Sequence, residues 1–300
     1  MNTSIAAFVD YLHYERGYSS STEAAYRSDL LQFEEYVRNH TENSDGDLHL
    51  IDADVVRAWM KSLMDSGRSS MSVNRKLSAL KSYFKYLIKQ GIVSDSPVYL
   101  VTGPKYSRPL PCFIKEEEME DLLDGDEFSD DFLGKRDRLI MELLYETGLR
   151  RSELALLKHA DIDIGAMLLK VNGKRNKQRL VPFAERLKVM IIDYLQEKNA
   201  IMPENETYLF VCKNGNPISC ENIYRIVREH LHECSLYVKC SPHILRHSFA
   251  TSMLNDGAKL NTVKELLGHS SLASTSIYTH ITFEKLKEMY YAHPRVGKLR

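Results

Sequence analysis

Four short segments in the second half of the sequence carry side chains whose types and spacing could do chemistry on a phosphate. In chain order they contain an arginine and a glutamate, a lysine, a histidine and an arginine, and a histidine and a tyrosine: Arg150 and Glu153, Lys174, His243 and Arg246, His269 and Tyr278. An arginine offers a planar fork of donors that fits a phosphate, and histidine and lysine can transfer protons. Each segment alone also has an ordinary interpretation, since the chain has seventeen tyrosines.

The first segment, residues 146–154, is a break between two helical patterns. Gly148 permits a turn, and Ser152 is expected to cap the helix that follows. Arg150 would then lie near the N-terminus of that helix. In isolation, the pattern favours Arg150 as the partner of a surface ion pair.

The second segment has the pattern of a basic β-hairpin. Short apolar runs flank the pair Asn172 and Gly173, which is typical of a hairpin turn. No acid occurs between Ala166 and Ala184, whereas five cations do: Lys170, Lys174, Arg175, Lys177 and Arg179. This density of one charge indicates a nearby anion, although a basic tip can also serve solubility alone.

The third segment is a predicted helix start at Ser241 and Pro242. The three-residue spacing puts His243 and Arg246 on one face of that helix. A zinc site at His243 and His247 is disfavoured, because the glutamate of the HExxH motif and a third ligand are both missing.

The fourth segment begins at Gly268, which is expected to end a helix and leave His269 projecting from the bend. Tyr278 follows nine residues later, on a short polar helix or loop.

Apolar periodicity divides the chain into two expected domains. Residues 1–102 are expected to be all-helical, residues 103–112 with three prolines to be an extended linker, and residues 113–300 to be a mixed domain. Helices are predicted in the first domain at 4–17, 21–39, 52–66 and 70–90, and in the second at 115–124, 133–147, 185–198, 219–233, 244–256 and 260–267 around a β region at about 160–183.

The net charge of −1 hides an uneven distribution. Residues 1–65 carry twelve acids and five bases, whereas residues 66–110 carry eight bases and one acid. We therefore expect Arg75, Lys76 and Lys81 to form a surface that faces phosphates, with a merely solvated helix face as the alternative.

Composition excludes several classes of protein. No uncharged apolar run could span a membrane, and the first residues lack the pattern of a signal peptide, so a cytoplasmic location is expected. The five cysteines are scattered, which predicts neither a disulfide framework nor a zinc site. Neither a glycine-rich phosphate loop nor a paired-carboxylate metal site occurs in the sequence, so no cofactor or metal is expected.

Together the four segments resemble the tyrosine recombinase (phage-integrase) family in order and spacing, and the likeness covers nearly the whole chain. Residues 290–295, YYAHPR, are similar to the bacterial Xer branch, and no arm-binding domain is expected before residue 1. The resemblance implies a mainly α fold with a small β-hairpin or sheet. A helical, SAM-like core-binding domain and a mixed α+β catalytic domain would form a C-shaped clamp around DNA.

The resemblance also implies a role for each residue. Tyr278 would attack a DNA phosphate held by Arg150 and Arg246. Of the remaining groups, His269 would donate a further hydrogen bond, His243 would be the general base, Lys174 the general acid, and Glu153 would orient its neighbours. Lys177 and Arg179 on the hairpin are expected to contact DNA. Two departures from the family pattern, Arg151 and Arg175, remove no catalytic group.

The resemblance finally implies double-stranded DNA as partner and a homo- or hetero-tetramer on it, with a C-terminal helix around residues 283–290 docking into a neighbouring protomer. Chromosome-dimer resolution at cell division is the expected role, and a mobile-element integrase or DNA invertase is the alternative. Outside this class, a type IB topoisomerase and a catalytically silent DNA-binding protein stay open.

Overall fold

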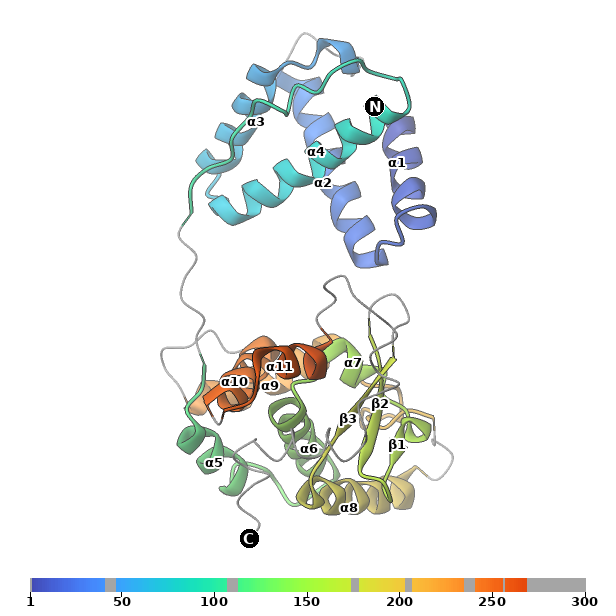
Figure 1. Ribbon diagram of the computed structural model, residues 1–300, viewed down its shortest axis with the longest axis vertical. Coiled ribbons are helices and arrows are strands. Elements are labelled where there is room, and N and C mark those ends of the chain that lie inside the picture. The colour runs from blue at the N-terminus through green and yellow to red at the C-terminus, as the bar shows by residue number, and fades with distance from the viewer. Residues whose placement is uncertain are drawn as a thin grey trace. The chain divides into compact units, whose positions relative to one another are not determined.

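The computed structural model describes residues 2–40, 47–106, 113–173, 178–202, 207–234, 241–255 and 257–268. The chain divides into two compact units, residues 1–109 and 110–300 (Figure 1). Pro104 lies inside the expected linker, yet its carbonyl oxygen accepts a 2.8 Å hydrogen bond from Asn74. The N-terminal unit therefore extends past residue 102.

The N-terminal unit is helical, as predicted. Its helices are α1 (Asn2–Tyr14), α2 (Ser20–His40), the short 3-10 helix η1 (Leu48–Leu50), α3 (Ala53–Asp65) and α4 (Ser70–Lys89). Asp52 caps α3 through the N–H groups of Asp54 and Val55, and Ser69 caps α4. The apolar stripes meet in a core that includes Phe8, Phe33, Trp59, Tyr83 and Phe84, all at most 1% exposed.

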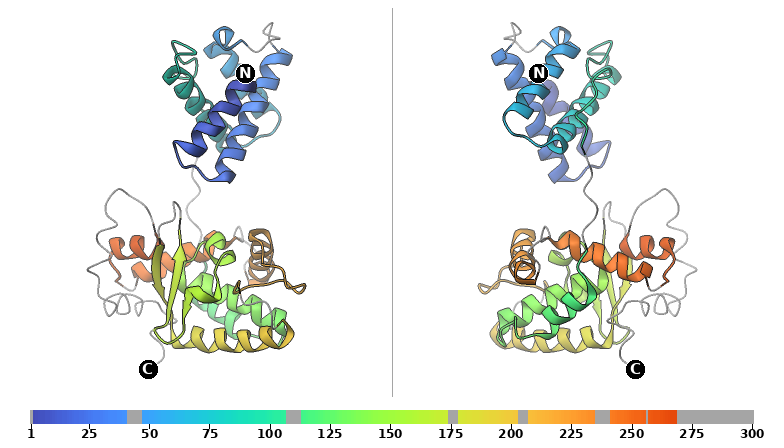
Figure 2. Two further views of the ribbon diagram at one scale, coloured as in Figure 1. Left: turned by 90° about the vertical axis from the view of Figure 1, so that its right-hand side faces the viewer. Right: turned by 90° about the vertical axis from the view of Figure 1, so that its left-hand side faces the viewer.

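The second unit combines helices with one small sheet (Figure 2). Its helices are α5 (Glu116–Asp124), α6 (Phe132–Thr147), α7 (Arg151–Ala155), η2 (His159–Asp161), α8 (Glu185–Ile201), α9 (Cys220–Cys234), α10 (Pro242–Asn255) and α11 (Leu260–Leu267). Helix α6 packs against both α8 and α10. Its run from Leu139 to Tyr145 is buried on every side, which identifies α6 as the central helix.

The sheet is antiparallel in the order β1 (Ile162–Asp163), β2 (Leu168–Asn172), β3 (Gln178–Pro182). Its last pair is Asn172 with Gln178, so residues 173–177 connect the strands. The expected hairpin is confirmed, but Asn172 is the last paired residue of β2 and is not part of the turn. Within the described parts of the chain, no helix is long and apolar enough to cross a membrane.

Candidate active site

The turn after α6 brings three helices together. Gly148 has φ 60° and ends α6 in the left-handed conformation that glycine adopts readily. A Cβ added at Gly148 would lie 2.6 Å from Phe249 on α10 and 2.8 Å from Leu267 on α11. The sequence needs glycine here because the backbone of this turn packs directly against both helices.

Helix α7 begins with an arginine held by a carboxylate. The backbone N–H of Arg150 donates to Glu153 Oε2 at 2.8 Å, and Arg150 Nη1 donates to Glu153 Oε1 at 2.8 Å. Arg150 is the N-cap residue and Ser152 lies within the helix, so the prediction that Ser152 caps α7 is wrong. Glu153, three residues along, satisfies the first N–H instead.

Glu153 is the anionic centre of this site. It is 7% exposed, and besides Arg150 it accepts bonds from Arg179 Nη1 at 2.9 Å and Arg179 Nη2 at 2.8 Å. Burial raises the pKa of Glu153, but the hydrogen bonds and charge of Arg179, followed by those from Arg150, outweigh it and lower the pKa to about 2. The carboxylate is therefore ionised at neutral pH.

Three arginines from three different segments converge on the C-terminus of α11. Arg179 Nε donates to the Leu266 carbonyl at 2.8 Å, Arg246 Nη2 to the Leu267 carbonyl at 2.5 Å, and Arg150 Nη2 to the Gly268 carbonyl at 3.3 Å. The last carbonyls of a helix lack intrahelical partners and carry partial negative charge, which favours cations there. The end of α11 is thus fixed by guanidiniums.

Arg246 is the more deeply buried of the two arginines that are predicted to bind the phosphate. It is 8% exposed, and its Nη1 donates to the Gly148 carbonyl at 2.5 Å. Burial, and next the charge of Arg150, lower its pKa to about 10, so it stays positive at neutral pH. Arg150 keeps 23% of its side chain exposed. Three guanidiniums face one carboxylate, so the cluster retains an excess of positive charge that suits an anion.

Helix α10 starts at Pro242 as predicted, and His243 lies in its first turn, one turn before Arg246. His243 is accessible to solvent, although the protein covers part of its side chain. Partial burial lowers the pKa of His243, and so do the charges of Arg151, His247, Arg246 and Arg150. A ring kept neutral by neighbouring cations can accept a proton.

Arg151 was not singled out as a site residue by sequence reasoning. Its guanidinium lies over the Tyr224 ring of α9, 5.6 Å from the ring centroid. It is the second cause, after burial, of the lowered pKa of His243. Arg151 directly follows Arg150 in the sequence, and this position could have indicated that it belongs to the site.

Four predicted site residues lie outside the part of the chain that the structure describes: Lys174, Lys177, His269 and Tyr278. The last described residue of the second unit is Gly268. Gly268, whose carbonyl Arg150 holds, directly precedes His269, and Gly268 ends α11 with φ 63° as predicted.

Arg179 has a different place from the one predicted. It was expected to contact DNA on a hairpin, but it is 6% exposed and lies on the inward face of β3, bonded to Glu153 and Leu266. A guanidinium used in this way has no free edge for a phosphate. The assignment of Arg179 as a DNA contact is therefore corrected.

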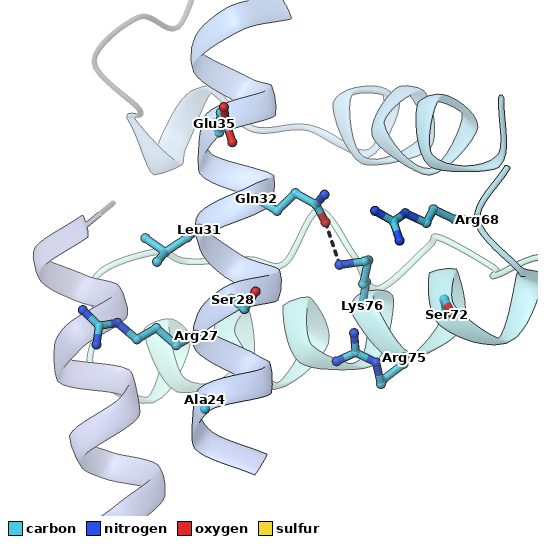
Figure 3. A pocket seen from close by; sticks show the side chains of 10 residues that line it. All are labelled: Ala24, Arg27, Ser28, Leu31, Gln32, Glu35, Arg68, Ser72, Arg75 and Lys76. Atoms are coloured by element: carbon cyan, nitrogen blue, oxygen red, sulfur yellow. Dashed lines mark hydrogen bonds between the residues drawn. The ribbon is translucent and has the colours of Figure 1, made fainter. Parts of the chain in front are cut away.

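A groove in the N-terminal unit is the candidate DNA-contact surface. Its volume is about 660 Å³, and Figure 3 shows Arg27 on α2, Arg68 before α4 and Arg75 on α4 at its lining. Arg27, Arg68 and Arg75 are exposed, as is Lys81 further along α4. We name Arg27, Arg68 and Arg75 the groove arginines.

Lys76 also lines this groove, but its ammonium is buried. It donates to Asp29 at 2.8 Å and to Gln32 at 2.6 Å, and Arg75 pairs with the same carboxylate of Asp29. The prediction that Lys76 faces phosphates is corrected, since Asp29 on α2 already neutralises it. Asp29 lies outside residues 66–110, so the charge balance of that segment does not include it.

Among the residues described, no group of three or more histidine, cysteine, aspartate or glutamate side chains could hold a metal ion.

Comparison with known proteins identifies the family of both units. Residues 112–285 match the phage integrase family, and residues 5–91 match the phage integrase N-terminal SAM-like domain. Tyrosine recombinase XerC of Listeria monocytogenes serotype 4a (strain HCC23) is 38% identical over 289 residues, covering 95% of both chains. That of Pediococcus pentosaceus is 39% identical over 292 residues, covering 95% of this chain and 96% of the other.

A solved structure of a recombinase has a similar fold. The XerH site-specific recombinase, in a post-cleavage complex with palindromic difH substrate, is 26% identical, with a TM-score of 0.69 over 92% of this chain and 81% of that one. The mainly helical fold with a small antiparallel sheet is confirmed. This chain therefore belongs to the phage integrase family and is a tyrosine-type, XerC-like site-specific recombinase.

Proposed function

We propose that the chain cleaves one DNA strand through Tyr278, leaving a 3′-phosphotyrosyl bond and a free 5′-hydroxyl. The reverse attack, by a 5′-hydroxyl of another strand, restores the phosphodiester and releases the tyrosine. Each step exchanges one phosphate ester for another, so the exchange needs no external energy source. The observation that carries the proposal is the excess positive charge of the arginine cluster at the turn preceding His269.

Arg150 and Arg246 hold the scissile phosphate in this proposal. The transition state concentrates charge on the non-bridging oxygens, and forked, permanently charged donors stabilise it more than the ground state. Both arginines are already fixed by bonds to backbone carbonyls, so little reorganisation is needed when the phosphate arrives. His269, next to the fixed Gly268, is assigned as a further donor.

Two groups move the protons. The hydroxyl of Tyr278 must lose its proton as it attacks, and His243, with its lowered pKa, is assigned as the acceptor. The leaving 5′ oxygen must gain a proton, and Lys174 between β2 and β3 is assigned as the donor. Glu153 orients Arg150 and, through its own charge, offsets part of the cluster's mutual repulsion.

Double-stranded DNA is the proposed partner of the N-terminal unit as well. The groove arginines, together with Lys81, present exposed cations that can neutralise backbone phosphates. Exposed cations of this kind bind the phosphates of any DNA sequence, so recognition of a particular target site must come from other contacts.

We assign the chain to chromosome-dimer resolution in the bacterial cytoplasm, acting as a homo- or hetero-tetramer on DNA. The similarity to XerC proteins over 95% of the chain supports this role. The spacing of four apolar residues is typical of one face of a helix, which supports docking of a C-terminal helix into a neighbouring protomer. These residues are Phe283, Leu286, Met289 and Tyr290. A mobile-element integrase or DNA invertase is the second candidate, and a footprint on chromosomal terminus DNA against element ends separates the two.

A nicked suicide substrate tests the chemistry, because loss of the cleaved fragment traps the covalent adduct. The wild-type chain should form the adduct, and Tyr278→Phe should form none while binding DNA normally. Exchange of strands between two duplexes should then distinguish a recombinase from a type IB topoisomerase, which reseals the same strand. Binding without any adduct would identify a catalytically silent protein and overturn the proposal.

A further inference from the structure

Arg179 lies where three segments of the catalytic unit meet. It comes from β3, it bonds Glu153 of α7 through both terminal nitrogens, and it bonds the Leu266 carbonyl of α11 through Nε. All three nitrogens of its guanidinium are therefore used inside the protein. Glu153 also accepts hydrogen bonds from the backbone N–H and from Nη1 of Arg150, so it links Arg179 to Arg150.

We infer that Arg179 is a positioning residue, which never contacts DNA but sets the placement of Arg150 and of the chain leading into His269. The inference rests on the proposed function, because that chemistry requires Arg150 and His269 to be placed correctly relative to each other. It assigns control of the cluster's geometry to a residue that does not itself bind the phosphate.

The contact between Arg179 and Gly268 supports this assignment. A Cβ at Gly268 would lie 3.2 Å from Arg179 Nη1 and 3.4 Å from its Cζ, so the turn after α11 rests against the guanidinium. Gly268 has φ 63°, which a residue with a side chain adopts poorly. The direction in which the backbone leaves α11 towards His269 is thus determined next to Arg179.

Only an arginine fits the three bonds. A guanidinium directs them in one plane at fixed angles, whereas the ammonium of lysine is a point donor that cannot reach Glu153 and Leu266 with the same geometry. A neutral residue would leave Glu153 with Arg150 as its remaining cation, and a buried carboxylate that loses its main partner is costly. Arg179→Lys and Arg179→Met should therefore both misplace the cluster.

Single-turnover cleavage of the suicide substrate measures the effect. We expect the cleavage rate of Arg179→Met to fall by about 100-fold, the size of effect that a displacement of about 1 Å can produce, with Arg179→Lys between it and the wild type. DNA affinity and the dependence of affinity on salt should stay unchanged, since no phosphate contact is removed. A lower affinity with a reduced salt slope would make Arg179 a DNA contact and overturn the inference.

Arg136 provides the matched control. It is 8% exposed, bonds Asp137 at 2.8 Å and the Val211 carbonyl at 3.2 Å, and so resembles Arg179 in burial and bonding. Arg136→Met should lower stability while the folded protein cleaves at the wild-type rate. Equal losses of cleavage in Arg136→Met and Arg179→Met would show general destabilisation and contradict a positioning role.

The pH profile of cleavage gives a readout that simple destabilisation does not move. Glu153 is faced by Arg179 and Arg150, and loss of Arg179 raises its pKa, so Arg179→Met should lose activity on the acid side at a higher pH than the wild type. The double variant Arg179→Met with Glu153→Gln removes the unpaired charge and should fold even if the single variant does not. Its acid limb should return to the wild-type position, which protonation of His243 sets. An unshifted acid limb in Arg179→Met would contradict the inference, as would an acid limb that stays shifted in the double variant.

A measurement without DNA separates this inference from the proposed function. Hydrogen exchange in residues 258–268 should accelerate by about tenfold in Arg179→Met and stay unchanged in Arg136→Met, because the end of α11 loses a fixed partner. Faster exchange with no adduct from the wild type would refute the proposed function alone. Unchanged exchange would refute the role of Arg179, whatever the wild type does.

Discussion

Cations gather in two regions of this molecule and are held in two different ways. In the catalytic unit, Arg179 and Arg246 are buried, and with Arg150 they are fixed by Glu153 and by successive carbonyls of α11. In the N-terminal unit, the groove arginines are exposed, and Asp29 fixes Arg75 and the buried Lys76. Buried guanidiniums with several partners are preorganised, which suits stabilisation of one transition state, whereas exposed ones suit loose binding of many phosphates.

The first prediction tests the preorganised region. Arg246→Lys should lower the single-turnover cleavage rate by at least about 100-fold, because a point charge cannot bond Gly148, Leu267 and a phosphate as a fork does. DNA affinity should change little. Single-turnover cleavage with saturating enzyme measures the rate, and a rate like the wild type's would show that Arg246 is only structural.

The second prediction tests the exposed region. Arg27→Gln combined with Arg68→Gln should weaken binding to all DNA sequences and reduce the slope of log K against log salt concentration by about 2, because each phosphate contact contributes about 0.9. Cleavage of fully bound DNA should be nearly normal. Titration by fluorescence anisotropy at several salt concentrations measures the slope.

Lys61→Gln is the control for the groove, since Lys61 is exposed on α3 and is not part of the lining. It should leave the slope unchanged. Were the control to lower the slope as much as the groove variant, binding would depend on total charge and the distinction between regions would fail.

The third prediction concerns stability. Glu153 has a pKa of about 2 in the folded chain against an ordinary 4.5, so the stabilisation is complete above pH 4.5 and is lost as the pH falls towards 2. The shift corresponds to about 3 kcal/mol, as an order of magnitude. Glu153→Gln should therefore be less stable than the wild type at pH 7, and the difference should shrink at pH 3.

Urea unfolding followed by circular dichroism measures this difference. Trp59 is the sole tryptophan of the chain and is buried in the N-terminal unit, so its fluorescence marks the transition of that unit and separates it from the other. A difference that is constant between pH 7 and pH 3 would mean that Glu153 is not held ionised by the arginines.

Local pattern was sufficient to predict most of the fold. Helix α4 was expected at residues 70–90 and runs from Ser70 to Lys89, because its apolar stripe and its cap are both encoded within the segment. The turn at Gly148 and the helix end at Gly268 were predictable for the same reason, since each depends on one residue with unusual backbone freedom.

Charge partners were not predictable from local pattern. Arg179 lies 26 residues from Glu153, and Lys76 lies 47 residues from Asp29, so both cations looked unbalanced in their own segments. One signal for Arg179 was present: it is in phase with Val181 on the strand, and alternation places both on the buried face. A cation on the buried face of a strand should prompt a search for a distant acid.

The identity of the nucleophile is the claim on which the account depends most directly. Peptide mapping by mass spectrometry of the adduct trapped on a suicide substrate would locate the nucleotide among the seventeen tyrosines. We predict a single modified peptide, with the phosphate on Tyr278. A nucleotide on any other residue would contradict the proposed mechanism.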